Sequence, residues 1–200
     1  MLAAMVSGAI AYALGSLPFS VWVGRVFTGQ DIRRSGSGHA GPTNVMRSAG
    51  WVAGLLALVL DVGKGFAAVR LAQSLSTWAW MPAIAAALAV AGHCWPLFAG
   101  FRGGMGMSPA GGALLAAWPL GFVLGVGLAA LTMLVVRHAA RANVAASLLV
   151  APVWALFGAA LPLISVAAAA GIIVAVRSST DWNRVYRELW WDRGSGDVRK

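Results

Sequence analysis

Charged residues are scarce in this 200-residue chain. Only 10% of its residues are Asp, Glu, Lys or Arg, whereas 60% are hydrophobic. A soluble globular domain carries about 25% charged residues, because most of its surface faces water. The shortage of charge therefore excludes a soluble globule and predicts an all-α integral membrane protein.

Cysteine and metal-binding patterns are also scarce. The single cysteine, Cys94, excludes an intramolecular disulfide, and no Cys/His spacing indicates zinc. The histidines His39, His93 and His138 begin no H-x4-D pair, and the sequence contains no G-x-S-x-G nucleophile elbow. We therefore expect no metal site and no hydrolytic machinery.

The few charges are strongly biased toward the positive sign, with a formal net charge of +9. Such a bias can indicate nucleic-acid binding, but here the basic residues stand singly at the ends of apolar runs. Orientation in a membrane explains them better, because cytoplasmic loops carry an excess of Lys and Arg. We expect the lipid bilayer, and not nucleic acid, as a partner.

Apolar runs predict the membrane elements. A helix needs roughly 20 apolar residues to cross the bilayer, so the runs divide into about seven elements, of which the fourth is too short to cross. The expected elements are residues 2–27, 51–71, 80–97, 110–118, 119–136, 143–160 and 161–176. We expect them to form one membrane domain, residues 1–178.

The distribution of arginine predicts the orientation. With the N-terminus outside and the C-terminus in the cytoplasm, only Arg70 lies at the outer end of an element. The arginines that then share the cytoplasmic side are Arg25, Arg33, Arg34, Arg47, Arg102, Arg137, Arg141 and Arg177. Both glycine-rich loops described below would face the cytoplasm.

The end of the chain changes character. Aromatic residues such as Trp182 and Trp190 recur at helical spacing, with charged residues between them. This pattern predicts an interfacial amphipathic helix over residues 179–193. We expect residues 194–200 to be a flexible tail.

The longest polar stretch, residues 28–48, is rich in glycine, hydroxyl and basic residues. Glycines let successive N–H groups converge, and guanidinium groups add donors, so such a loop suits phosphate. The alternative is a solvated connector between two helices. The candidate binding residues here are Arg33, Gly36, Ser37, Gly38, Gly41, Thr43, Asn44 and Arg47.

A second glycine-rich stretch covers residues 92–112 and carries His93, Arg102, Gly103 and Gly104. Its prolines and glycines predict broken or re-entrant backbone, which a membrane tolerates only beside protein or a water-filled cavity. A helix beginning near Ser108 would point its N-terminal amides at this loop, which again suits an anion.

Two charged residues interrupt the apolar run 51–71. Asp61 and Lys64, three residues apart, lie on one helix face and can pair. A charge inside the membrane is costly, so this pair is either part of a functional site or a clamp between helices.

Four motifs, in order and spacing, resemble the bacterial acyl-phosphate-dependent glycerol-3-phosphate acyltransferase family (PlsY). They are GSLP at 15–18, DIRRSGSGHAGPTNVMR at 31–47, LDVGKG at 60–65 and GHCWPLFAGFRGGMG at 92–106. The resemblance implies a seven-helix bacterial inner-membrane enzyme, expected as a monomer without cofactors. It would transfer a fatty acyl group from acyl phosphate to the 1-hydroxyl of glycerol 3-phosphate, giving lysophosphatidic acid for phospholipid biosynthesis.

The resemblance also implies site residues. Ser37 and Arg47 match residues that hold the phosphate of glycerol 3-phosphate, and His93 matches the third motif, so these three are the catalytic candidates. The remaining substrate-binding candidates are Arg33, Gly36, Gly38, Gly41, Thr43, Asn44, Asp61, Lys64, Arg102, Gly103, Gly104 and Asn183.

The chain departs from the family pattern at several positions. His39 replaces an asparagine, Pro42 an alanine, and Met105 the phosphate-binding lysine of GGKG; the terminal H-x-x-N pattern falls on Thr180 and Asn183. Losing a charge-assisted contact costs about 1.5–3 kcal/mol. Arg102 or a protonated His39 are candidates for supplying the missing charge.

Two other functions stay open at this point. Met105 and His39 together are compatible with a different phosphorylated acceptor on the same scaffold. A non-catalytic membrane binder or transporter of a phosphorylated lipid precursor is the other alternative, although the sequence shows no inverted repeat.

Overall fold

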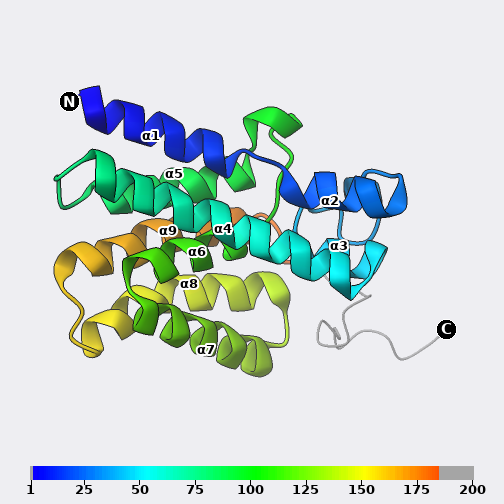
Figure 1. The fold of residues 1–200 in the computed structure, drawn as a ribbon. Helices are drawn as coiled ribbons and strands as arrows, with labels where there is room; N and C mark the ends of the chain where they lie inside the picture. Colours follow the sequence, from blue (N-terminus) through cyan, green and yellow to red (C-terminus); the bar gives the residue numbers. More distant parts are fainter. Residues whose placement is uncertain (1, 185–200) are drawn as a thin grey trace.

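The computed structural model describes residues 2–184, and these residues form helices and connecting loops (Figure 1). The α-helices are α1 (Leu2–Gly15), α2 (Phe19–Thr28), α3 (Pro42–Ala49), α4 (Trp51–Leu75), α5 (Met81–Cys94), α6 (Met107–Ala117), α7 (Pro119–Val136), α8 (Ala139–Leu156) and α9 (Leu161–Ser179). Two short 3-10 turns, η1 (Ile32–Arg34) and η2 (Leu97–Ala99), lie in the glycine-rich stretches.

Six segments of the described chain are long and apolar enough to cross a membrane, and α6 is a seventh, shorter apolar helix. This confirms the prediction of about seven elements with a short fourth one. Large apolar side chains such as Leu134 and Val135 point outward, with 67% and 73% of their surface exposed. The chain is a multi-pass integral membrane protein whose outer surface suits lipid.

The first expected element, residues 2–27, forms one membrane span but not one continuous helix. The chain breaks between Gly15 and Phe19, so that α1 and α2 are separate helices. Pro18 has no N–H and cannot continue the helical hydrogen bonds. The Leu17 carbonyl at the break accepts a hydrogen bond of 2.8 Å from Lys64 Nζ on α4.

Helix α4 packs against five other helices, α1, α2, α3, α5 and α6 (Figure 1). Its contact with α6 is close because both helices use glycine. A Cβ added to Gly65 would lie 2.0 Å from the Pro109 carbonyl oxygen, and one added to Gly112 would lie 1.9 Å from that of Val62. Any side chain at either position would force α6 away from α4.

Other boundaries differ from the sequence-based expectation. The expected polar loop contains a helix, α3, which begins at Pro42, a favourable first helical residue. Helix α8 begins four residues earlier than predicted, since the His138 side chain accepts from the Arg141 N–H and caps it. The expected amphipathic helix began at Ser179, which is the last residue of α9; residues 180–183 form a turn, so the expected helix does not continue there. Its remainder, and the expected tail 194–200, lie outside the described residues.

Candidate active site

The loop before α3 is organised by one buried side chain, Asn44. Its amide oxygen accepts from the Ser37 N–H at 3.0 Å. Its amide nitrogen lies within hydrogen-bond distance of the carbonyl oxygens of Ile32, Ser35 and His39, at 2.8, 3.2 and 3.0 Å. Because the side-chain amide of Asn44 is hydrogen-bonded to backbone groups, it fixes the shape of the loop that carries Ser37.

A cavity of about 260 Å³ opens beside this loop. Three of its walls come from the loop with α3, from the end of α5 with the second glycine-rich stretch, and from the α7–α8 turn. Its main polar lining residues are Ser37, His39, Thr43, Asn44, Arg47, His93, Ser108 and Asn143. The cavity therefore brings together the three catalytic candidates, Ser37, Arg47 and His93, from segments far apart in the chain.

The two glycine-rich stretches are joined at Gly103, and the second stretch folds back on its own His93 at Gly104. Ala40 N–H donates to the Gly103 carbonyl at 3.3 Å, and Gly104 N–H donates to the His93 carbonyl at 3.2 Å. A Cβ on Gly104 would meet His93 Nε2 at 2.3 Å, and one on Gly103 would meet the His93 carbonyl at 1.9 Å. These glycines let the second stretch lie against His93, so their role is close packing.

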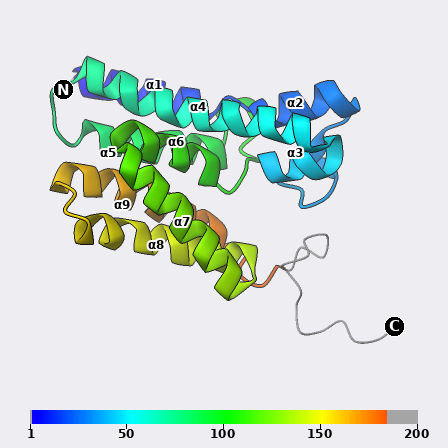
Figure 2. The same cartoon turned by 60° about the horizontal axis from the view of Figure 1, so that its bottom comes forward.

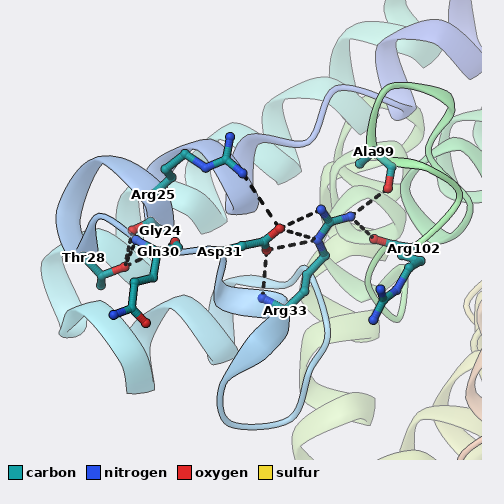
Figure 3. A network of polar contacts seen from close by, with 8 residues as sticks. All are labelled: Gly24, Arg25, Thr28, Gln30, Asp31, Arg33, Ala99 and Arg102. Carbon is teal, nitrogen blue, oxygen red and sulfur yellow. Dashed lines mark hydrogen bonds and ion pairs between the residues drawn. The ribbon is translucent and has the colours of Figure 1, made fainter.

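Arg33 is a clamp between the same two stretches (Figure 3). Its guanidinium donates to both carboxylate oxygens of Asp31, the shortest contact being 2.7 Å, and to the carbonyls of Ala99 and Arg102 at 2.7 and 3.3 Å. The hydrogen bond from Arg33 is the main cause that lowers the pKa of Asp31 to about 2. The clamp is therefore complete above pH 3.8, the ordinary pKa of Asp31, and weakens as the pH falls toward 2.

Replacing Arg33 with glutamine should lower the stability of the protein by roughly 1.5–3 kcal/mol, because a charge-assisted, bidentate contact is lost. Thermal unfolding in detergent measures the change. The matched control is Arg34→Gln, since the adjacent Arg34 is exposed. Equal unfolding temperatures for both variants would contradict the clamp.

Asp61 and Lys64 lie behind the cavity and do not line it. Lys64 Nζ is 2.9 Å from Asp61 Oδ1, and Ser20 Oγ donates to Asp61 Oδ2 at 2.6 Å. Asp61 Oδ1 is also 3.6 Å from His93 Nδ1. Both charged side chains are almost fully buried. The pair links α2 and α4 to His93. Asp61 therefore contacts His93 on the side of the imidazole ring that faces away from the cavity.

His39 connects the first glycine-rich stretch to the end of α9 and the turn after it. It contacts Asp181, which lies 142 residues later in the sequence. Its Nε2 is 2.6 Å from Asp181 Oδ2, and its Nδ1 is 3.2 Å from a guanidinium nitrogen of Arg177. Since a guanidinium can only donate, Nδ1 accepts and Nε2 carries the proton. Burial lowers the pKa of His39. His39 is therefore neutral at pH 7 and does not replace the charge that Met105 lacks.

Several sequence-predicted residues lie elsewhere. Arg33, Asp61, Lys64, Gly104 and Asn183 do not line the cavity, and the Asn183 side chain instead accepts from Arg141 at 3.5 Å. Arg102, Gly103 and Gly38 line a neighbouring cavity of about 240 Å³, and Gly36 lines one of about 400 Å³. Arg102 therefore does not supply the missing charge to the cavity of Ser37.

Asn143 and Ser108 are cavity residues that the sequence reasoning missed. Asn143 lies in the first turns of α8, and its carbonyl accepts from Ser147 Oγ. An asparagine near the start of an apolar run was a usable signal, because an amide within a membrane helix needs a polar surrounding. Ser108 was considered only as the start of a helix.

An apolar groove of about 90 Å³ lies next to the cavity, since Met107 and Ala129 line both. Its walls are α6, α7, α8 and α9. Helix α7 lies at the edge of the bundle, next to α6 and α8 (Figures 1 and 2). A polar cavity and an apolar groove thus meet at one point.

The chain is similar to known proteins along most of its length. A family model described as glycerol-3-phosphate acyltransferase matches residues 5–188. The glycerol-3-phosphate acyltransferase of Synechococcus sp. (strain JA-3-3Ab) is 42% identical over 177 residues, which cover 86% of this chain and 85% of the relative. That of Pseudomonas aeruginosa (strain UCBPP-PA14) is 40% identical over 156 residues, covering 77% and 82%.

Solved structures agree with this similarity. The glycerol 3-phosphate form of PlsY, an integral membrane glycerol 3-phosphate acyltransferase, matches with a TM-score of 0.80 and 29% identity over 90% of both chains. Its lysophosphatidic acid form matches with a TM-score of 0.78 and 27% identity, again over 90% of both chains. With this fold, and with a family match that spans nearly the whole chain, the protein belongs to the glycerol-3-phosphate acyltransferase family.

Proposed function

We propose that the protein transfers a fatty acyl group from acyl phosphate to the 1-hydroxyl of glycerol 3-phosphate, forming lysophosphatidic acid and phosphate. The observation that carries the proposal is the meeting of the polar cavity and the apolar groove at Met107 and Ala129. A small phosphorylated acceptor suits the cavity, and an acyl chain suits the groove. The glycerol 3-phosphate and lysophosphatidic acid forms of PlsY support the acceptor and the product.

In this proposal Ser37 and Arg47 hold the phosphate of the acceptor. Ser37 offers a hydroxyl, and Arg47, in the last turn of α3, offers a guanidinium that can make two parallel hydrogen bonds to phosphate. His93 lies in another wall of the same cavity, with Asp61 behind its Nδ1. There it would hydrogen-bond the attacking hydroxyl and hold it toward the mouth of the groove.

The reaction needs little covalent help from the protein. The 1-hydroxyl oxygen attacks the carbonyl carbon, and the bond between this carbon and the phosphate oxygen breaks. The leaving phosphate takes the electron pair of that bond and accepts the hydroxyl proton. Because the donor is already activated, holding both substrates close together and stabilising the charge that develops on the carbonyl oxygen supply the acceleration.

We further propose that the protein acts as a monomer in the bacterial cytoplasmic membrane, with the N-terminus outside. Arg33, Arg47 and Arg102 on the two glycine-rich stretches favour the cytoplasmic side for the cavity. Phosphorylated metabolites are present on that side. Accessibility of cysteines introduced at Arg34 and at Arg70 to a membrane-impermeant thiol reagent tests this orientation, with Cys94 replaced by serine.

Acyl transfer by the purified, detergent-solubilised protein tests the function. Acyl phosphate and labelled glycerol 3-phosphate should give lysophosphatidic acid, whereas acyl-CoA, the control donor, should not. No product from folded protein with either donor would overturn the proposal. Binding of glycerol 3-phosphate without turnover would then indicate a membrane binder.

One alternative has an observation in its favour: Met105 and a neutral His39 line the cavity, so it holds less positive charge than the family pattern implies. A phosphorylated acceptor other than glycerol 3-phosphate is compatible with this. Other polyol phosphates, offered in the same assay, separate the two possibilities. A higher kcat/KM for one of them than for glycerol 3-phosphate would support the alternative.

Replacing Met105 with lysine should lower the KM for glycerol 3-phosphate roughly tenfold, because a charge-assisted contact is worth about 1.5–3 kcal/mol. Met105→Gln is the matched control, since glutamine has similar length without charge. The KM for acyl phosphate, measured in the same series, shows whether the effect is confined to the acceptor. An unchanged KM for the acceptor in Met105→Lys would contradict the placement of its phosphate beside Met105.

A further inference from the structure

Two neighbouring helices of the apolar groove each carry a glycine in its wall. Gly111 on α6 and Gly125 on α7 both line it. A Cβ added to Gly125 would lie 3.0 Å from Leu114 Cδ1 and 3.6 Å from Val150 Cγ2. A Cβ added to Gly111 would lie 3.5 Å from Phe122 Cε2. The groove is therefore narrow at this level, and a larger side chain at either position would push against these lining residues and narrow it further.

The two glycines lie at the same depth below the polar cavity. Met107 and Ala129, which line both spaces, are each four residues from a glycine, Met107 from Gly111 and Ala129 from Gly125. Four residues of helix correspond to about 6 Å. The first few carbons of an acyl chain would fit above the glycines, and the rest of a long chain must pass between them.

Beyond the glycines the groove has no room to widen. Leu114, Phe122 and Val150 line the groove there. Leu114 and Val150 belong to the same core cluster as Trp154, and Phe122 packs against this cluster. Trp154 is fully buried, and its Nε1–H donates to the Gly121 carbonyl at 3.0 Å. Its ring meets that of Trp118 edge to face, with 5.2 Å between the ring centroids. This packing is rigid, so space lost at the glycine level cannot be recovered below it.

We propose that Gly125, with Gly111 opposite, is the specificity-determining position for the acyl chain: the missing side chains admit long acyl groups. The inference rests on the proposed acyl transfer, since it assigns the groove to the donor chain. A side chain at this level would leave short donors unaffected and exclude the part of a long chain that extends past it. The protein would then discriminate donors by length.

The test compares palmitoyl phosphate and butyryl phosphate as donors for full-length Gly125→Leu. The kcat/KM for palmitoyl phosphate should fall roughly tenfold or more, because the burial of several CH₂ groups is lost. The value for butyryl phosphate, whose chain ends above the glycine level, should stay within about twofold. The ratio of the two values is the measured quantity.

Gly127→Leu is the matched control on the same helix. Gly127 is exposed, and a Cβ there would meet nothing within 4 Å. The same substitution should therefore leave both donors unchanged. Gly125→Leu combined with Leu114→Ala should restore the use of palmitoyl phosphate, since Leu114 is the nearest side chain across the groove. If Gly125→Leu does not fold, Gly111→Leu replaces it.

Binding gives a readout that does not need turnover. Palmitoyl phosphate should raise the unfolding temperature of the wild type and of Gly127→Leu, and not that of Gly125→Leu. The inference would be overturned if the ratio of kcat/KM for the two donors were unchanged in Gly125→Leu. It would also be overturned if palmitoyl phosphate raised the unfolding temperature of folded Gly125→Leu as much as that of the wild type. If the wild type makes no lysophosphatidic acid but shows this binding pattern, the proposed function fails while the acyl groove stands.

Discussion

Replacing Arg47 with alanine should lower kcat/KM for glycerol 3-phosphate roughly hundredfold or more. Among the described residues that line the cavity, Arg47 carries the one guanidinium group, because Met105 stands where the family has lysine and His39 is neutral. Removing one partner of a desolvated charge pair costs about 2–5 kcal/mol. The substrate phosphate would be left without its main cationic partner.

The kinetic pattern of Arg47→Ala is also specific. The acceptor phosphate is held alike in the ground state and the transition state, so most of the loss should appear in KM for glycerol 3-phosphate. The KM for acyl phosphate should change little. Arg47→Lys should recover part of the activity, because lysine restores the charge without the bidentate geometry.

Arg34→Ala serves as the control, since Arg34 lies in the preceding loop and is exposed. It should retain the kinetics of the wild type. Unfolding temperatures of all variants separate a loss of binding from a loss of folded protein. An unchanged kcat/KM in folded Arg47→Ala would rule out the proposed phosphate site.

Replacing Asp61 with asparagine should destabilise the protein by about 3–5 kcal/mol, because Lys64 would remain as an unpaired buried charge. Asp61 is fully buried, and Lys64 Nζ lies 2.9 Å from its carboxylate. Thermal unfolding in detergent measures the loss. An unfolding temperature equal to that of the wild type would contradict this expectation.

The double variant Asp61→Leu with Lys64→Met separates structure from function. Apolar residues of similar volume often replace a buried ion pair without loss of stability, so the double variant should be more stable than Asp61→Asn. Its activity should stay low, because Asp61 no longer holds His93 from 3.6 Å away. Recovery of both stability and activity would show that the pair is a clamp between helices and does not act through His93.

Much of the fold could be predicted because membrane spans depend on local composition. The apolar runs and the shortage of charge identified six spans and the short helix α6, since backbone polar groups in lipid must be satisfied within a helix. The break at Pro18 was harder, because a proline in a membrane helix can either kink or end it. In the structure the helix ends there, and Lys64 donates to the Leu17 carbonyl from another helix.

For the polar residues, too, local composition predicted the general property, and contacts between distant segments decided the individual roles. Composition showed that residues 28–48 hold many donors, but not which donors point into a cavity. Arg33 and Arg47 are both arginines of this polar stretch, and its composition does not distinguish them. In the structure Arg33 binds Asp31 and the Ala99 carbonyl, whereas Arg47 lines the cavity. The difference arises from α3, a helix of eight residues in which Arg47 occupies the last turn.

The sequence by itself determined that the chain crosses a membrane, that its polar chemistry lies in two glycine-rich stretches and which family it resembles. These properties are local, because hydropathy and loop composition are read over neighbouring residues. The tertiary structure alone decided that Ser37, Arg47 and His93 share one cavity, that His39 meets Asp181, and that the cavity joins an apolar groove. His39 and Asp181, for example, are 142 positions apart, and only the packing of the helices brings them together.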